Sequence, residues 1–399
     1  MKKIMLLLAI GLMVSLAFNV DAKEVSAMTT VYSGETLYVL NWGEYMDPEL
    51  VEQFETTFDV TVVYDEVGSN EEMEVRIKAG TTKYDVAFPS DYMIDKLRQQ
   101  NLLNEIDHTK LTGLSNVTIK PEVASLTEGK GYDSYFIPYF WGTIGIMYNT
   151  DSVDEADLTG WEVLFDTDSS YRIGMYNSAR DAAAAALLYL GYDVNTNDED
   201  ELSEAEDALR AMDYSVVGED NLKTLVQSGN LDMALVYSGD YFDTLYIAEE
   251  EEADINFGFY VPDTTNVWVD GFVIPTTSEN TDLAHEFINF FLDEAVAEQN
   301  ADWVGYAPVL DEVFDTLTNP DGDYGYDYDN YDPYPAGSSR VIYEYISDAR
   351  FQRLNELLDA AKASDIETGC FSSLQLSTFV LPAVMTVAVL AVFALKKQK

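Results

Sequence analysis

The sequence predicts an α/β fold in which helices cover a mostly parallel sheet. Short apolar runs, which begin near Leu37, Val60 and Tyr84, alternate with segments of helical periodicity. This β-α-β-α-β order is typical of parallel strands joined by helices. A chain of 399 residues is also long enough for two domains, each with its own core.

The composition is strongly acidic. The formal net charge is −50, from 72 acidic and 22 basic residues. Such a surface repels phosphates, so we expect no nucleic-acid partner. It attracts cationic ligands, although an acidic surface can equally reflect a saline habitat. With one cysteine, Cys370, and two histidines far apart in the sequence, we expect no disulfide, no metal site and no cofactor.

The first helices carry recognisable start signals. Asp47 can cap a helix that begins at Pro48. Ser69 with Glu72 forms a capping box, and Ser90 can cap the helix that follows the third strand. We therefore expect each of these helices to begin directly after a strand and its turn.

Polar and aromatic side chains gather where the first and third strands end. Trp42, Glu44 and Tyr45 follow the first strand, and Ser90 and Tyr92 follow the third. Ligands of open α/β sheets bind at the carboxyl ends of strands. A carboxylate beside aromatic rings suits an organic cation, which pairs with the charge and lies on the ring faces. The alternative is that the rings are ordinary core residues.

Similar clusters recur in the second half of the chain. A long apolar run, 136–148, contains two glycines and is expected to pass from one domain into the other. Tyr237 and Asp240 follow a strand at 232–236, and strand alternation places Trp268 and Asp270 on one face. Tyr306 lies in a turn.

Two acidic features allow a simpler interpretation. Asp181 lies in the first turn of an alanine-rich helix, where a carboxylate can serve the helix dipole alone. Residues 193–204 partly match a calcium-binding loop, but Asp198 stands where that loop needs glycine, so we interpret them as a loop that leads into an acidic helix.

The last element expected in the globular part of the chain is a closing helix over 341–363.

Both ends of the chain predict targeting segments. Residues 1–27 resemble a secretory signal with possible cleavage after Ala22 or Ala27, which the sequence leaves undecided. Residues 367–375 are expected to form a tether, 376–395 a C-terminal transmembrane helix, and 396–399 a basic cytoplasmic tail. The alternative for 376–395 is a buried core helix.

Several motifs together resemble the polyamine-binding (spermidine/putrescine) solute receptors of bacterial ABC importers. They are Asn41-Trp-Gly-Glu-Tyr45, Tyr84-Asp-Val-Ala-Phe-Pro-Ser-Asp-Tyr92, Ile137-Pro-Tyr-Phe-Trp-Gly142, Ala179-Arg-Asp181, Trp268-Val-Asp270 and Gly305-Tyr306. The resemblance implies a two-lobed, type II periplasmic-binding-protein-like fold with discontinuous lobes and a hinge. It places lobe one at 36–143 and 271–315, and lobe two at 144–270 and 316–366.

The resemblance also implies roles for individual residues. Trp42, Tyr45, Tyr237, Trp268 and Tyr306 would enclose the methylene chain of a polyamine; Glu44, Asp181, Asp240 and Asp270 would take its ammonium groups; Ser90, Tyr92 and Glu344 would add polar contacts. Gly43, Tyr237 and Ser178 depart from the family pattern and leave the length of the ligand open.

The function implied is therefore a binding protein and not an enzyme. It would be a monomer that captures putrescine or spermidine on the extracytoplasmic face of the membrane and delivers it to an ABC permease. Two alternatives stay open: the same fold with another amine, a sugar or a metal complex as ligand, and a hydrolase that uses two carboxylates.

Overall fold

The computed structural model describes residues 31–166, 170–322, 324–326 and 330–368. The strands are β1 (Thr36–Trp42), β2 (Thr61–Val67), β3 (Val86–Ala87), β4 (Leu103–Asn104), β5 (Phe136–Asn149), β6 (Ile173–Tyr176), β7 (Tyr214–Gly218), β8 (Met233–Tyr237), β9 (Phe257–Tyr260), β10 (Thr264–Pro275), β11 (Ala307–Pro308) and β12 (Ser339–Val341). The helices are α3 (Pro48–Phe58), α4 (Asn70–Ala79), α5 (Asp91–Gln99), α6 (Pro121–Thr127), α7 (Glu162–Phe165), α8 (Ala179–Leu190), α9 (Glu199–Ala211), α10 (Asn221–Gln227), α11 (Ser238–Glu250), α12 (Thr281–Phe291), α13 (Glu294–Val304), α14 (Asp311–Thr318) and α15 (Asp348–Thr368).

Two parallel groups of strands are joined by two long strands. β1 pairs in parallel with β2 and β3, and β6 pairs in parallel with β7 and β8. Between these groups lie β10 and β5, which run antiparallel to each other and to their outer neighbours β3 and β8. The sheet is therefore mixed and not mostly parallel as predicted, because the chain crosses the molecule along β5 and returns along β10.

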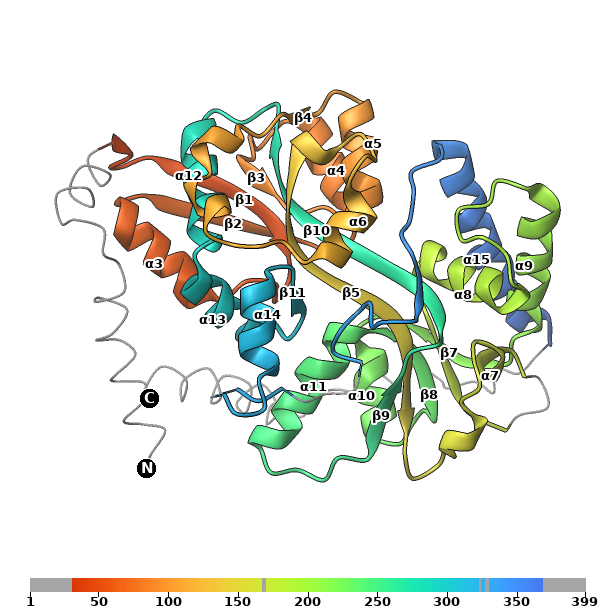
Figure 1. Ribbon diagram of the computed structural model, residues 1–399. Coiled ribbons are helices and arrows are strands. Elements are labelled where there is room, and N and C mark those ends of the chain that lie inside the picture. Colours follow the sequence, from red (N-terminus) through yellow and green to blue (C-terminus); the bar gives the residue numbers. More distant parts are fainter. Residues whose placement is uncertain (1–30, 167–169, 323, 327–329, 369–399) are drawn as a thin grey trace, which may run out of the picture.

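The predicted α/β two-lobed architecture is confirmed. Figure 1 shows β1, β2 and β3 with α3, α4, α5, α12 and α13 on one side of the molecule, and α8, α9, α15 and the remaining parallel strands on the other, with β5 and β10 running between them. Phe54, Phe88, Phe272 and Phe287 are fully buried in the core of the first lobe. In the second lobe α15 packs against α8 and α9.

The helix starts follow the predicted signals, with one exception that bears on the site. The carboxylate of Asp47 accepts from the backbone N–H of Glu49, and the hydroxyl of Ser69 accepts from that of Glu72 at 3.1 Å. Ser90 holds the cap position of α5 but makes no capping hydrogen bond. Its hydroxyl instead accepts from Nδ2 of Asn70 at 3.0 Å.

The closing helix begins later than predicted. Residues 342–347 follow β12 without regular secondary structure, and α15 begins only at Asp348. The backbone there bonds to other segments, because the carbonyls of Val341 and Ile342 accept from the side chains of Asn266 and Asn195 at 2.9 Å each. These partners replace the intrahelical hydrogen bonds that a helix would need.

The predicted fold class needs a second correction, which concerns the membrane. Among the described residues, no helix combines the length and the apolar character that crossing a bilayer requires. The structure therefore supports the two-lobed fold without the predicted transmembrane helix. The segments 1–27 and 376–395, on which the signal and the anchor were predicted, lie outside the described residues.

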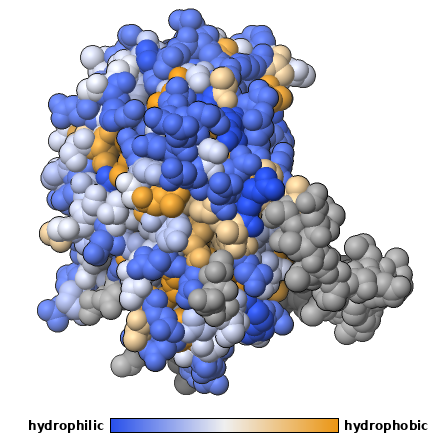
Figure 2. Space-filling view, turned by 90° about the vertical axis from the view of Figure 1, so that its right-hand side faces the viewer, coloured by the Kyte–Doolittle hydropathy of each residue, from blue (hydrophilic) through white to orange (hydrophobic). Residues whose placement is uncertain are grey.

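On the face shown in Figure 2 the surface is mostly hydrophilic.

A candidate ligand-binding cleft between the two lobes

A cleft of about 1340 Å³ is lined by residues of both lobes. Eleven of the twelve predicted site residues lie along it: Trp42, Glu44, Tyr45, Ser90, Tyr92, Asp181, Tyr237, Asp240, Trp268, Asp270 and Tyr306. They come from segments that are far apart in the sequence. The two crossing strands and the ends of the parallel strands bring them together.

Glu344 is the predicted site residue that lies elsewhere. Its side chain is exposed and does not line the cleft, and one carboxylate oxygen lies 2.6 Å from the ammonium of Lys130. The prediction placed Glu344 in a helix, whereas residues 342–347 form no helix or strand. Glu344 is therefore placed on the surface and not at the end of the ligand site.

The segment after β3 fixes the part of β10 that faces the cleft. A carboxylate oxygen of Asp91 accepts from the backbone N–H of Val269 at 2.9 Å, and the carbonyl of Pro89 accepts from Gly271 at 3.2 Å. The pairing of β10 with β5 shifts between Asp270 and Gly271, as in a β-bulge. These contacts direct the side chains of Trp268 and Asp270 into the cleft.

The carboxyl group of Asp270 is buried and incompletely paired. Its residue is 5% exposed, and Oδ1 has no hydrogen-bond partner among the described residues. Burial raises the pKa of this carboxyl to about 7, although the neighbouring Ser90 and Tyr45 side chains oppose the rise. The indole N–H of Trp268 and the hydroxyl of Tyr45 are likewise buried without a partner in the described part of the chain.

Aromatic rings surround this carboxyl group. The ring centroids of Trp268 and Tyr306 lie 5.2 Å apart, and those of Tyr45 and Tyr306 lie 5.5 Å apart. Tyr237 meets Trp268 edge-on at 6.4 Å. Tyr45 is held in place through its carbonyl, which accepts from the hydroxyl of Tyr139 at 2.8 Å. The rings thus form an apolar wall beside a buried acid.

Trp42 and Glu44 form the edge of the cleft in the first lobe. The indole N–H of Trp42 donates to the carbonyl of Phe88 at 2.8 Å, which ties the ends of β1 and β3 together. Glu44 is exposed and has a φ of 52°. Non-glycine residues rarely adopt this left-handed conformation, which often marks functional sites.

Asp181 is held by two tyrosines. Its carboxylate accepts from the hydroxyl of Tyr237 at 2.6 Å and from that of Tyr343 at 2.8 Å. The helix cap is provided by Ser178, whose hydroxyl accepts from the backbone N–H of Asp181 at 3.3 Å. Asp181 still lies in the first turn of α8, so its carboxylate contacts two tyrosines and is also placed to interact with the helix dipole.

Sequence reasoning missed Arg180, which lies on the wall of the cleft. Its guanidinium carbon lies 3.7 Å from the centre of the Tyr92 ring and 5.5 Å from that of Tyr343. Arg180 belongs to the second lobe and Tyr92 to the first, so this cation–π contact joins the lobes. The only signal was its place between Ala179 and Asp181 in a motif that drew attention to the acid.

A lysine was also missed at another part of the cleft wall. The ammonium of Lys223 lies 3.9 Å from Oδ1 of Asp240 and 2.7 Å from a carboxylate oxygen of Asp220. The hydroxyl of Tyr306 donates to Asp240 over 3.4 Å. Burial raises the pKa of Asp240 to about 6, and Lys223 opposes this rise. In the sequence Lys223 resembles any polar residue of a short helix.

The family model of the bacterial extracellular solute-binding proteins matches residues 49–322. The chain belongs to this family. The family is a class of solute-binding proteins and not a class of enzymes. Within the described residues, no three histidine, cysteine or acidic side chains are placed to hold a metal ion.

Relatives of this solute-binding protein are about 30% identical to it over the aligned residues. The spermidine/putrescine-binding periplasmic protein of Escherichia coli is 31% identical over 274 residues, which cover 68% of this chain and 76% of the relative. The putrescine-binding periplasmic protein SpuD of Pseudomonas aeruginosa is 29% identical over 320 residues, which cover 76% and 87%.

Solved structures show the same fold. The substrate-binding protein of a spermidine/putrescine ABC transporter from Streptococcus pneumoniae superposes with a TM-score of 0.65 and 31% identity, covering 83% of this chain and 99% of that one. The iron-bound protein HitA of Pseudomonas aeruginosa, at 19% identity and a TM-score of 0.56, shares the fold alone.

Proposed function

We propose that this solute-binding protein captures putrescine or spermidine outside the cytoplasmic membrane and delivers it to the permease of an ABC importer. The relatives above are similar over most of their length and are named for these two polyamines. The cleft has the chemistry that a polyamine needs, since carboxylates alternate with aromatic rings along its wall.

The observation that carries this proposal is the unpaired Oδ1 of Asp270 beside the rings of Trp268 and Tyr45. A buried carboxylate oxygen without a partner is costly, and an ammonium group that donates to it would remove that cost. The rings attract the same positive charge and exclude water from it. We therefore place one ligand ammonium at Asp270.

The other proposed ligand residues extend the same chemistry. Asp181 and Asp240 lie on the same cleft and can receive further ammonium groups, while Tyr237, Trp268 and Tyr306 can enclose the methylene chain. Trp42, Glu44, Tyr45, Ser90 and Tyr92 complete the wall from the first lobe. Closure of the lobes on the ligand would create the form that a permease recognises.

We also propose the division of the chain that the resemblance implied. Lobe one comprises 36–143 and 271–315, and lobe two comprises 144–270 and 316–366. The hinge would then lie in β5 and β10, which are the strands that cross between the lobes.

Calorimetry on protein freed of ligand by unfolding and refolding tests the proposal. Putrescine and spermidine are titrated alongside a neutral sugar and a ferric complex, so that the alternative ligands are covered. We expect binding heat with at least one polyamine and none with the sugar or the ferric complex. Absence of heat with both polyamines would overturn the proposed function.

Two variants separate the cleft from the rest of the surface. Asp270→Asn removes the charge at the proposed ammonium site and should weaken polyamine binding by about tenfold or more. Asp213→Asn makes the same chemical change at an exposed aspartate that does not line the cleft and should leave affinity unchanged. Equal affinity of both variants would show that the site is placed wrongly.

A further inference from the structure

The cleft contains an ammonium group of its own. Lys223 belongs to α10 in the second lobe and lines the cleft next to Asp240. Its Nζ lies 3.9 Å from Oδ1 of Asp240, 3.8 Å from Oδ2 of Asp243 and 2.7 Å from Oδ1 of Asp220. The Lys223 side chain is only 16% exposed. The ammonium of Lys223 is therefore held in the cleft wall and does not belong to a freely exposed surface side chain.

Lys223 stays charged in this place. Burial lowers its pKa, but Asp240, Asp220 and Asp243 outweigh burial, and the net change is upward. The ammonium is therefore present whenever the protein binds its ligand near neutral pH.

Asp240, which neighbours Lys223, is one of the groups proposed to receive a ligand ammonium. Asp240 also accepts from the hydroxyl of Tyr306, whose ring stands 5.2 Å from that of Trp268. Asp270 and Asp240 thus flank the Trp268–Tyr306 pair, and Asp240 is the one of the two that has an internal cation. Lys223 therefore already supplies part of the positive charge that Asp240 would otherwise receive from a ligand ammonium.

We propose that Lys223 is a specificity-determining residue: its ammonium stands in for a ligand ammonium beside Asp240 and disfavours polyamines that place a third positive charge there. This inference rests on the proposed polyamine function and deepens it by naming the class of ligand. The cleft then prefers a diamine such as putrescine to a triamine such as spermidine. A triamine ammonium near Asp240 would meet a fixed like charge at close range.

Replacing Lys223 tests the inference. Lys223→Met removes the charge and keeps an unbranched apolar stem, whereas Lys223→Arg keeps the charge. Affinities of the ligand-stripped full chain for putrescine and spermidine are measured by calorimetry. We expect wild type and Lys223→Arg to prefer putrescine, and Lys223→Met to shift the spermidine-to-putrescine affinity ratio upward by about tenfold. Lys223→Gln is the second variant if Lys223→Met does not fold.

A double variant identifies where the gained affinity comes from. In Lys223→Met/Asp240→Asn the shift toward spermidine should be smaller than in Lys223→Met, because the third ammonium loses Asp240 and keeps only Asp220 and Asp243 nearby. An unchanged ratio in Lys223→Met, or an equal shift in Lys223→Arg, would overturn the inference while polyamine binding itself stands. Failure of wild type to bind either polyamine would instead overturn the proposed function.

Discussion

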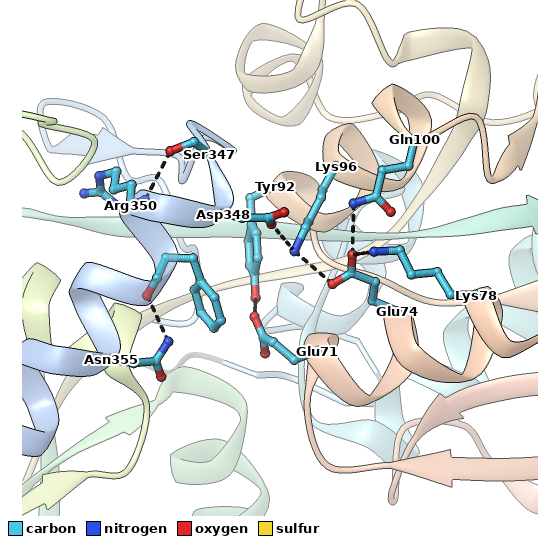
Figure 3. A network of polar contacts seen from close by, with 11 residues as sticks. Glu71, Glu74, Lys78, Tyr92, Lys96, Gln100, Ser347, Asp348, Arg350 and Asn355 are labelled. Carbon is cyan, nitrogen blue, oxygen red and sulfur yellow. Dashed lines mark hydrogen bonds and ion pairs between the residues drawn. The ribbon is translucent and has the colours of Figure 1, made fainter.

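The ammonium of Lys96 lies 2.9 Å from a carboxylate oxygen of Asp348 and 2.9 Å from one of Glu74 (Figure 3). Lys96 and Glu74 belong to α5 and α4 of the first lobe, whereas Asp348 begins α15 of the second. The ring centres of Tyr345 and Phe351 lie 5.6 and 5.9 Å from the same nitrogen. One mostly buried cation therefore joins the two lobes near the cleft.

This contact should stabilise the closed form. Because Asp348 is largely exposed, the ion pair contributes only about 1 kcal/mol or less. We expect Lys96→Met to weaken putrescine binding by about two- to fivefold, mainly through faster dissociation. Stopped-flow release and calorimetry measure the two quantities.

Lys78→Met is the matched control for this prediction. The ammonium of Lys78 lies 2.6 Å from the other carboxylate oxygen of Glu74, but both residues belong to α4. Its loss should leave the dissociation rate unchanged, since no contact between lobes is removed. Identical rates for the two variants would mean that Lys96 holds α4 and α5 together without affecting closure.

Polyamine affinity should depend on pH through Asp270. Burial raises its pKa to about 7, so protonation competes with the ligand ammonium below that pH. We expect affinity for putrescine to fall as the pH is lowered from about 8 to about 5.5, by up to about tenfold per pH unit below the pKa. Calorimetry across this range provides the check, and Asp270→Asn should show a flatter profile. A constant wild-type affinity would contradict the assignment.

The same group should make the ligand-free protein less stable at high pH. A carboxyl whose folded pKa lies above its unfolded value of 3.8 binds its proton more tightly when folded, so stability falls as the pH rises from about 4 to about 7. Asp270→Asn removes this penalty and should raise the free energy of unfolding at pH 8 by on the order of 2 kcal/mol. Denaturant titrations without ligand at about pH 8 and pH 4.5 should show the higher free energy of unfolding of Asp270→Asn at pH 8 alone. A lower free energy of unfolding of this variant at pH 8 would contradict the view that the buried Asp270 carboxylate destabilises the ligand-free protein.

Gly239 sets the position of Tyr306. A Cβ at Gly239 would lie 2.2 Å from the Tyr306 ring, which would have to move out of its place beside Trp268. Gly239→Ala should therefore weaken polyamine binding by about tenfold. Adding Gly239→Ala to Tyr306→Leu should weaken it much less, because the clashing ring is already absent. Fully additive losses would show that Gly239 acts by another route.

Much of the cleft follows from local sequence patterns. Trp42 and Glu44 stand at or just after the end of β1, whose apolar run is evident, and the topology of an α/β sheet brings such strand ends together. Trp268 and Asp270 lie in the middle of β10, where strand alternation places them on one face. Their roles as ligand residues stay predictions. The α/β architecture is likewise visible, because strands and capped helices alternate in the first hundred residues.

What the sequence could not provide depends on contacts between distant segments. The pairing of Arg180 with Tyr92 and of Lys223 with Asp240 arises only when the chain has folded. The irregular segment around Tyr343 was missed because the carbonyls of Ile342 and Val341 accept from the side chains of Asn195 and Asn266, contacts that no local pattern reveals. The antiparallel return of β10 also has no local signal.

A crystal structure of the ligand-stripped protein with putrescine tests the central claim most directly. We expect an ammonium nitrogen within about 3 Å of Oδ1 of Asp270, with the methylene chain against the rings of Trp268 and Tyr306. A polyamine bound elsewhere, with this carboxylate oxygen still unpaired, would contradict it.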